Sequence, residues 1–195
     1  MAAGTIAGLL DECAARRPDH PLLRDVTGAT LTVAEVAALA TTATRWLWDA
    51  GVRPGNTVAW QLPSHVNAAV VMLALARTPV TQAPVLHLYR SREVQAALDI
   101  VRADILLLDE STADNAPAGV RTAVVPTDLV GQLRSSIAGQ HPGLEGARAA
   151  TDPRWVYFTS GTTGRPKGVV HTDATLLSAS HGYVCLLYTS DAADE

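Results

Sequence analysis

The stretch of sequence that decides the fold reads Tyr157-Phe158-Thr159-Ser160-Gly161-Thr162-Thr163-Gly164-Arg165-Pro166-Lys167-Gly168. From residue 159 to residue 168 it holds four hydroxyl side chains, three glycines and one lysine. Glycines let backbone N–H groups approach an anion closely, and hydroxyl groups donate hydrogen bonds to phosphate oxygens without adding charge. The lysine adds a compact positive charge. The residues therefore predict a loop that holds a polyphosphate, and we call residues 159–168 the phosphate loop.

The spacing of the phosphate loop differs from that of two common phosphate-binding motifs. A Walker A loop, as in P-loop kinases and ATPases, needs lysine directly after its last glycine, whereas Arg165 and Pro166 separate Gly164 from Lys167 here. The dinucleotide pattern of three glycines at fixed spacing is also absent. Two other interpretations of the residues are a plain hairpin turn over residues 160–164 and a minor-groove AT-hook at residues 164–167. A single copy in an acidic chain disfavours the AT-hook.

Lysine is rare in this chain. Of its 15 basic residues, 14 are arginine, and Lys167 is the only lysine. An arginine-rich composition is typical of GC-rich coding, so the arginines alone indicate little. Lysine and arginine are not interchangeable at a compact phosphate site, which makes Lys167 the more informative residue.

The composition is that of a globular protein. A length of 195 residues fits one domain or part of a larger one, and 48% hydrophobic residues can form a core. The net charge of −4 argues against a nucleic-acid partner bound through its phosphates. The two cysteines, Cys13 and Cys185, form neither a disulfide framework nor a zinc pattern. The apolar run over residues 68–76 is too short to cross a bilayer, and no signal peptide is recognisable. We therefore expect a cytoplasmic protein without a transmembrane segment.

Helical and strand patterns alternate along the chain. Thr32 and Glu35 predict a capping box, and Ser91 is the expected cap of a later helix. The expected helices cover residues 6–16, 33–50, 66–76, 92–101 and 127–137, and the expected strands cover residues 57–62, 80–83, 105–108, 121–125 and 155–159. Alternation of this kind predicts an α/β fold with a largely parallel sheet. The phosphate loop follows the carboxyl end of a strand, where ligands bind in such sheets.

The phosphate loop closely resembles the signature of the AMP-forming superfamily, which contains acyl-CoA synthetases, luciferases and peptide-synthetase adenylation modules. Residues 31–36, 51–59 and 61–64 resemble the opening helix, first turn and first core strand of that superfamily. Residues 87–94 are similar to the branch that activates medium-chain, alicyclic or aromatic carboxylates as CoA thioesters. The resemblance covers nearly the whole chain and implies the first part of the large N-terminal adenylate-forming domain.

The resemblance implies a two-step ligase reaction with ATP, Mg²⁺ and CoA. A small-molecule carboxylic acid attacks the α-phosphate of MgATP to give an acyl-adenylate and pyrophosphate, and the thiol of CoA then displaces AMP. The phosphate loop would hold the β- and γ-phosphates, with Lys167 as the catalytic residue that stabilises their charge. The implied nucleotide-binding residues are Thr159, Ser160, Gly161, Thr162, Thr163, Gly164, Lys167 and Gly168.

Several assignments stay open at this stage. His171 is either a substrate-side residue or a structural one. Asp109 and Glu110 lack a third ligand, so no metal site is expected within the chain. A peptide-synthetase adenylation module and a luciferase-like enzyme are alternatives to a carboxylate–CoA ligase, and a catalytically silent nucleotide-binding homologue is an alternative of another class. Residues 77–79 and 171–175 depart from the superfamily's usual pattern, which bears on the substrate branch.

The last eleven residues, 185–195, resemble the translation of a transposon-derived sequencing adaptor. We therefore expect residues 1–184 to be a truncated N-terminal portion of an AMP-dependent ligase domain, and residues 185–195 not to be native. Later parts that the resemblance implies are missing: an adenine-binding segment, a Mg²⁺-binding Glu, a ribose-binding Asp and a C-terminal domain. The chain by itself is expected to be inactive, and its oligomeric state is open.

Overall fold

A six-stranded sheet forms the centre of the computed structural model, which describes residues 4–25, 28, 30–146, 148–159 and 166–190. The strands are β3 (Thr57–Gln61), β4 (Thr81–Pro84), β5 (Ile105–Leu108), β6 (Thr122–Val124), β7 (Trp155–Thr159) and β8 (Lys167–His171). Their order is β6-β5-β3-β4-β7-β8. All neighbouring pairs are parallel except β7 and β8, which are antiparallel. The predicted α/β fold with a largely parallel sheet is confirmed.

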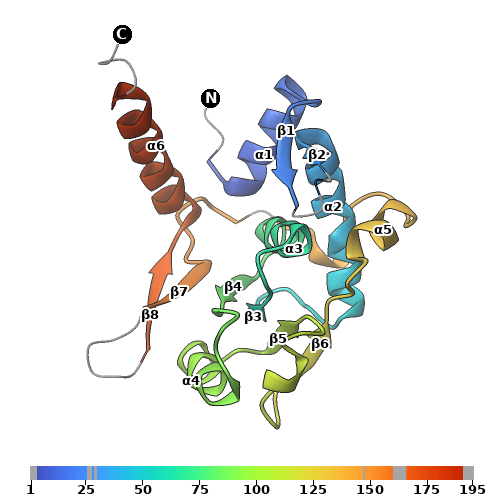
Figure 1. The fold of residues 1–195 in the computed structure, drawn as a ribbon, viewed down its shortest axis with the longest axis vertical. Helices are drawn as coiled ribbons and strands as arrows, with labels where there is room; N and C mark the ends of the chain where they lie inside the picture. The colour runs from blue at the N-terminus through green and yellow to red at the C-terminus, as the bar shows by residue number, and fades with distance from the viewer. Residues whose placement is uncertain (1–3, 26–27, 29, 147, 160–165, 191–195) are drawn as a thin grey trace.

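Helices cover both faces of this sheet (Figure 1). They are α1 (Ile6–Arg16), α2 (Val33–Asp49), α3 (Val66–Ala76), α4 (Ser91–Val101), α5 (Leu129–Arg134) and α6 (Asp173–Ser190). Strand β5 shows the two-sided burial, since all four of its side chains are at most 1% exposed. Ile105 and Leu107 face the core formed with α2 and α3, whereas Leu106 and Leu108 face the core under α4. A strand buried on both faces is typical of a parallel sheet between helical layers.

The first part of the chain confirms the predicted capping signals. The Glu35 backbone N–H donates to the Thr32 hydroxyl at 3.3 Å, and the Thr32 N–H donates to the Glu35 carboxylate at 2.8 Å. This capping box starts α2. Before it, β1 (Pro21–Arg24) and β2 (Thr30–Thr32) form a separate antiparallel pair that the sequence did not indicate. These strands are too short, at four and three residues, to show an alternating pattern.

Two predicted helix starts were wrong. Ser91 is the first residue of α4 rather than its cap, because the Glu93 carboxylate accepts from the backbone N–H of Arg90, one residue earlier. The helix expected over residues 127–137 is α5, which begins after its cap Asp128 and ends at Arg134. Short 3-10 turns, η1 (Ala113–Asn115) and η2 (Pro142–Leu144), lie in segments where neither a helix nor a strand was expected.

The end of the described chain is helical. Helix α6 runs through residue 190, and residues 191–195 lie outside the described residues. The expected non-native origin of residues 185–195 therefore stays a prediction. No helix among the described residues combines the length and apolar character needed to cross a bilayer.

Candidate functional site

The phosphate loop connects the two strands of the β7–β8 hairpin. Thr159 pairs with Lys167 in the last registered position, so residues 160–166 bridge the open end. Because β7 runs parallel to β4, this end lies at the same edge of the sheet as the carboxyl ends of the parallel strands. The expected position at a carboxyl end is therefore confirmed. Figure 1 shows α6 leaving from the opposite end of the hairpin.

Only the flanks of the phosphate loop are among the described residues. Thr159 and Lys167 are both exposed, and as directly opposed residues they lie on the same face of the hairpin. The predicted nucleotide-binding residues Ser160, Gly161, Thr162, Thr163 and Gly164 lie outside the described residues. The hydroxyl group of Thr159 and the ammonium group of Lys167 therefore lie on neighbouring strands, on the same exposed face of the hairpin.

Gly168 lies on the face opposite to Lys167, because successive strand residues alternate. A Cβ at this position would come within 3.0 Å of Val156 Cγ1 and 3.2 Å of Ile100 Cγ2. Ile100 belongs to α4, so the missing side chain lets that helix pack against the hairpin. The structure gives Gly168 a packing role, and its predicted role in nucleotide binding stays a prediction.

His171 lies at the base of the hairpin, away from the phosphate loop. It pairs with Trp155, four positions along β8 from Lys167, which corresponds to about 13 Å of strand. Its ring meets the Tyr157 ring edge-on, with the centroids 5.7 Å apart. Burial raises the pKa of the Tyr157 hydroxyl. His171 is thus part of an aromatic group with Tyr157, and a contact with substrate stays a prediction.

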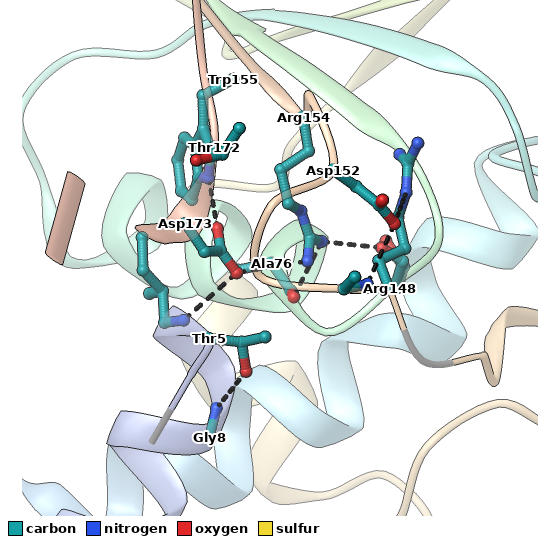
Figure 2. A network of polar contacts seen from close by, with 12 residues as sticks. Thr5, Gly8, Ala76, Arg148, Asp152, Arg154, Trp155, Thr172 and Asp173 are labelled. Atoms are coloured by element: carbon teal, nitrogen blue, oxygen red, sulfur yellow. Dashed lines mark hydrogen bonds and ion pairs between the residues drawn. The ribbon is translucent and has the colours of Figure 1, made fainter. Parts of the chain in front are cut away.

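A buried arginine precedes β7 and anchors the base of the hairpin (Figure 2). Arg154 Nη2 donates hydrogen bonds to the carbonyl oxygens of Ala76 and Thr78, both at 2.9 Å, and to that of Leu75 at 3.3 Å. These carbonyls end α3, where a cation is favourable because of the helix dipole. The side chain of Arg154 is 3% exposed.

Asp173, at the start of α6, is the counterion of Arg154. Its carboxylate Oδ2 lies 3.4 Å from Arg154 Nη1 and accepts from the backbone N–H of Ile6, in the first turn of α1, at 3.2 Å. Its Oδ1 accepts from the indole N–H of Trp155 at 2.6 Å. The carboxylate is fully buried, so each of its contacts acts without competition from water. We call Arg154, Trp155 and Asp173 the hairpin hub.

The hairpin hub has an energetic cost. Burial lowers the pKa of the Arg154 guanidinium, and the nearby Asp173 carboxylate opposes that shift. Arg154 Nε has no hydrogen-bond partner among the described residues. An unpaired buried donor costs on the order of 1–3 kcal/mol. The contacts of the hub therefore fix the orientation of its side chains, while part of their contribution to the free energy of folding is lost to this cost.

The sequence indicated none of these hub contacts. Thr172 and Thr175 exchange backbone-to-hydroxyl hydrogen bonds at 3.0 and 3.1 Å, and this local pattern could have predicted the start of α6. Arg154 and Asp173 carry no such local signal, because they contact each other and residues of α1, α3 and β7 that are distant in sequence. Among the described residues, no group of three or more His, Cys, Asp or Glu side chains could hold a metal ion.

The profile of the family "AMP-binding enzyme" matches residues 10–194 of this sequence. The chain belongs to this family. The match includes the β7–β8 hairpin that presents Thr159 and Lys167, and the role of these two residues in nucleotide binding stays a prediction.

Two relatives of this chain show how much of their length it spans. Novobiocin biosynthesis protein H of Streptomyces niveus is 32% identical over 181 residues, covering 89% of this chain and 30% of that protein. Oxalate–CoA ligase of Arabidopsis thaliana is 31% identical over 192 residues, covering 92% of this chain and 37% of that protein. The chain therefore spans about a third of the length of these curated relatives.

Solved structures show the same fold. The complex of VinN with 3-methylaspartate matches with a TM-score of 0.81 at 22% identity, covering 95% of this chain and 52% of VinN. The N-terminal subdomain of Klebsiella oxytoca NpsA matches with a TM-score of 0.74 at 23% identity, covering 89% of this chain and 43% of that subdomain. At these identities the likeness concerns the fold alone.

Proposed function

We propose that the parent protein activates a carboxylic acid with ATP, and that the phosphate loop of this chain holds the β- and γ-phosphates. The supporting observation is that the β7–β8 hairpin places Thr159 and Lys167 side by side at the carboxyl edge of the sheet, in a member of the AMP-binding family. A carboxylate oxygen attacks the α-phosphorus, and the bond to the bridging oxygen of pyrophosphate breaks.

Lys167 acts on the leaving group in this reaction. Negative charge grows on the pyrophosphate as its bond to the α-phosphorus breaks, and a fixed ammonium group stabilises that charge. Thr159 donates a neutral hydrogen bond to the same phosphates and so orients them. Mg²⁺ would enter bound to the nucleotide, and no residue of this chain is assigned a role in holding it.

The second step needs an acceptor for the acyl group. We propose CoA as this acceptor, since Oxalate–CoA ligase is among the relatives. The thiol of a carrier protein is the second candidate, because nonribosomal peptide synthetase gloA of Glarea lozoyensis is 31% identical over 155 residues. We also propose that the protein works in the cytoplasm, in keeping with its two cysteines and their lack of a disulfide pattern.

Lys167 provides the experiment. As the only lysine, it can be acetylated and followed by peptide mass without interference from other side chains. We expect ATP and inorganic tripolyphosphate to protect Lys167 from acetylation, and Lys167→Ala to weaken tripolyphosphate binding about tenfold in calorimetry. Arg16→Ala removes the same charge from exposed α1 and is the matched control. Unprotected Lys167 at saturating ATP would contradict the proposal.

Catalysis is tested separately from binding. We propose that the 195-residue chain binds the phosphates of ATP but does not catalyse carboxylate-dependent exchange between ATP and pyrophosphate. Exchange by the chain alone would overturn this part. Exchange by the full-length parent, screened over carboxylic acids with and without CoA, distinguishes a ligase from a catalytically silent nucleotide-binding homologue.

A further inference from the structure

We propose that Arg154 and Asp173 are positioning residues for phosphate binding, because they set the direction of the hairpin that presents Thr159 and Lys167. The inference rests on the proposed function, since it concerns phosphate binding by the same hairpin. Neither residue belongs to the phosphate loop. Their effect is exerted through the strands that lead from the hub to the loop.

The hub lies where both strands of the hairpin meet the rest of the protein. Arg154 directly precedes β7, and Asp173 follows β8 by two residues. The backbone N–H of Arg154 donates to the carbonyl oxygen of His171 at 3.1 Å, which closes the base of the hairpin. The ion pair between Arg154 and Asp173 joins the same two chain segments through their side chains. β7 therefore begins, and β8 ends, at a shared and buried support.

The hub also fixes this support against two helices. Arg154 holds the carbonyl oxygens at the end of α3, and Asp173 accepts from the N–H of Ile6 in α1. Figure 2 shows the arginine and the carboxylate reaching toward these helix ends from neighbouring positions. A guanidinium group with several partners in one plane has little freedom to rotate. The orientation of the hairpin base is thus tied to α1 and α3.

Beyond its base the hairpin is partly exposed. The registered pairing of β7 with β4 is limited to Gln82 and Trp155, at the base. Further out, Tyr157 and Val169 are 36% and 39% exposed, and Val170 is 57% exposed. On one face, Val156 and Phe158 pack with the core under α4, and Gly168 lies close to Ile100 of that helix. A small rotation at the base would therefore displace Thr159 and Lys167 at the far end.

Stability alone does not account for a buried ion pair at this position. Pairs of this kind can often be replaced by apolar residues without loss of stability, so their distinct contribution is geometry. Arg154 Nε, which lacks a partner among the described residues, is consistent with a network that is not tuned for stability. What the hub provides is a set of directed bonds to α1 and to the end of α3.

The test separates positioning from folding. Asp173→Asn keeps the shape and an acceptor for Trp155 but removes the charge that balances Arg154. The double variant Arg154→Gln/Asp173→Asn removes both charges and so avoids an uncompensated buried cation. Leu133→Ala, in the buried core of α5, is the control for general destabilisation. Each protein is studied at a temperature where circular dichroism shows it to be folded, with acetylation of Lys167 as the readout.

Both hub variants are expected to need at least about tenfold more ATP or tripolyphosphate for half-protection of Lys167, because small displacements of a positioned group are costly. Leu133→Ala should protect like the original chain. Equal protection constants for the folded hub variants and the control would overturn the positioning role while leaving the proposed function in place. Absence of protection in the unmodified chain would overturn both, and the two failures are therefore distinguishable.

Discussion

Gly168 is the residue at which the phosphate loop and the packing of α4 meet. A methyl group there would press on Val156, whose branched side chain is stiff, and on Ile100, which is 43% exposed and can move. We expect Gly168→Ala to lower the free energy of unfolding by about 1–2 kcal/mol through overpacking. Urea denaturation measures this loss, and Ile100→Ala in the same chain should recover part of it.

Gly182 is the matched control for this substitution. It lies in α6 with open space around its Cβ position, so Gly182→Ala should leave stability unchanged or raise it by up to about 1 kcal/mol. Similar losses for both substitutions would mean that the close approach to Val156 and Ile100 does not limit residue 168.

Single residues also show how far the sequence could predict the site. Lys167 and Thr159 were predicted because glycines, hydroxyls and the lysine are adjacent in sequence, and such chemistry can be recognised locally. Arg154 and Asp173 were not, because Asp173 binds the N–H of Ile6 across 167 positions. A contact over that distance depends on tertiary packing. The departure from the family pattern at residues 171–175 was noted, but only the structure shows Asp173 to be buried against Arg154.

At the scale of elements, the starts of α2 and α4 allow a direct comparison. Thr32 caps α2 through a reciprocal capping box with Glu35, so Thr32→Ala should cost about 1 kcal/mol of unfolding free energy. Ser91 was predicted to cap α4, but it lies inside the helix, and its hydroxyl makes a 3.4 Å contact with the Asp114 carbonyl oxygen. Ser91→Ala should therefore change stability by less than about 0.5 kcal/mol. Chemical denaturation of both variants measures the difference; a larger loss for Ser91→Ala would restore the prediction made from sequence.

The strands that the sequence missed have too few residues or too little alternation to form a pattern. Strands β1 and β2 have four and three residues. Strand β8 contains the adjacent valines Val169 and Val170, both exposed, instead of alternating apolar and polar residues. It forms because β7 supplies a complete partner along its length. Pairing with a neighbour, rather than its own composition, determines this strand.

At the scale of the whole molecule, β8 is the edge strand next to the hub, and β6 is the edge strand on the other side. β8 has five residues and exposes Val169 and Val170, and no strand of the described part of the chain pairs with its outer edge. Such an edge can pair with the same edge of a second molecule. We therefore expect the 195-residue chain to self-associate with rising concentration, as measured by analytical ultracentrifugation.

Lysine substitutions on the two edge strands distinguish association by strand pairing from nonspecific association. Val170→Lys places a charge on β8, where Val170 is 57% exposed, and should shift the association to at least about tenfold higher concentration. Val124→Lys adds the same charge to β6, where Val124 is 47% exposed, but that strand has only three residues and offers fewer backbone groups. Equal effects of the two substitutions would point to net charge as the cause. A selective effect of Val170→Lys would show that the hairpin presenting the phosphate loop is also the surface through which the chain associates, so that ATP binding should be measured at concentrations below that transition.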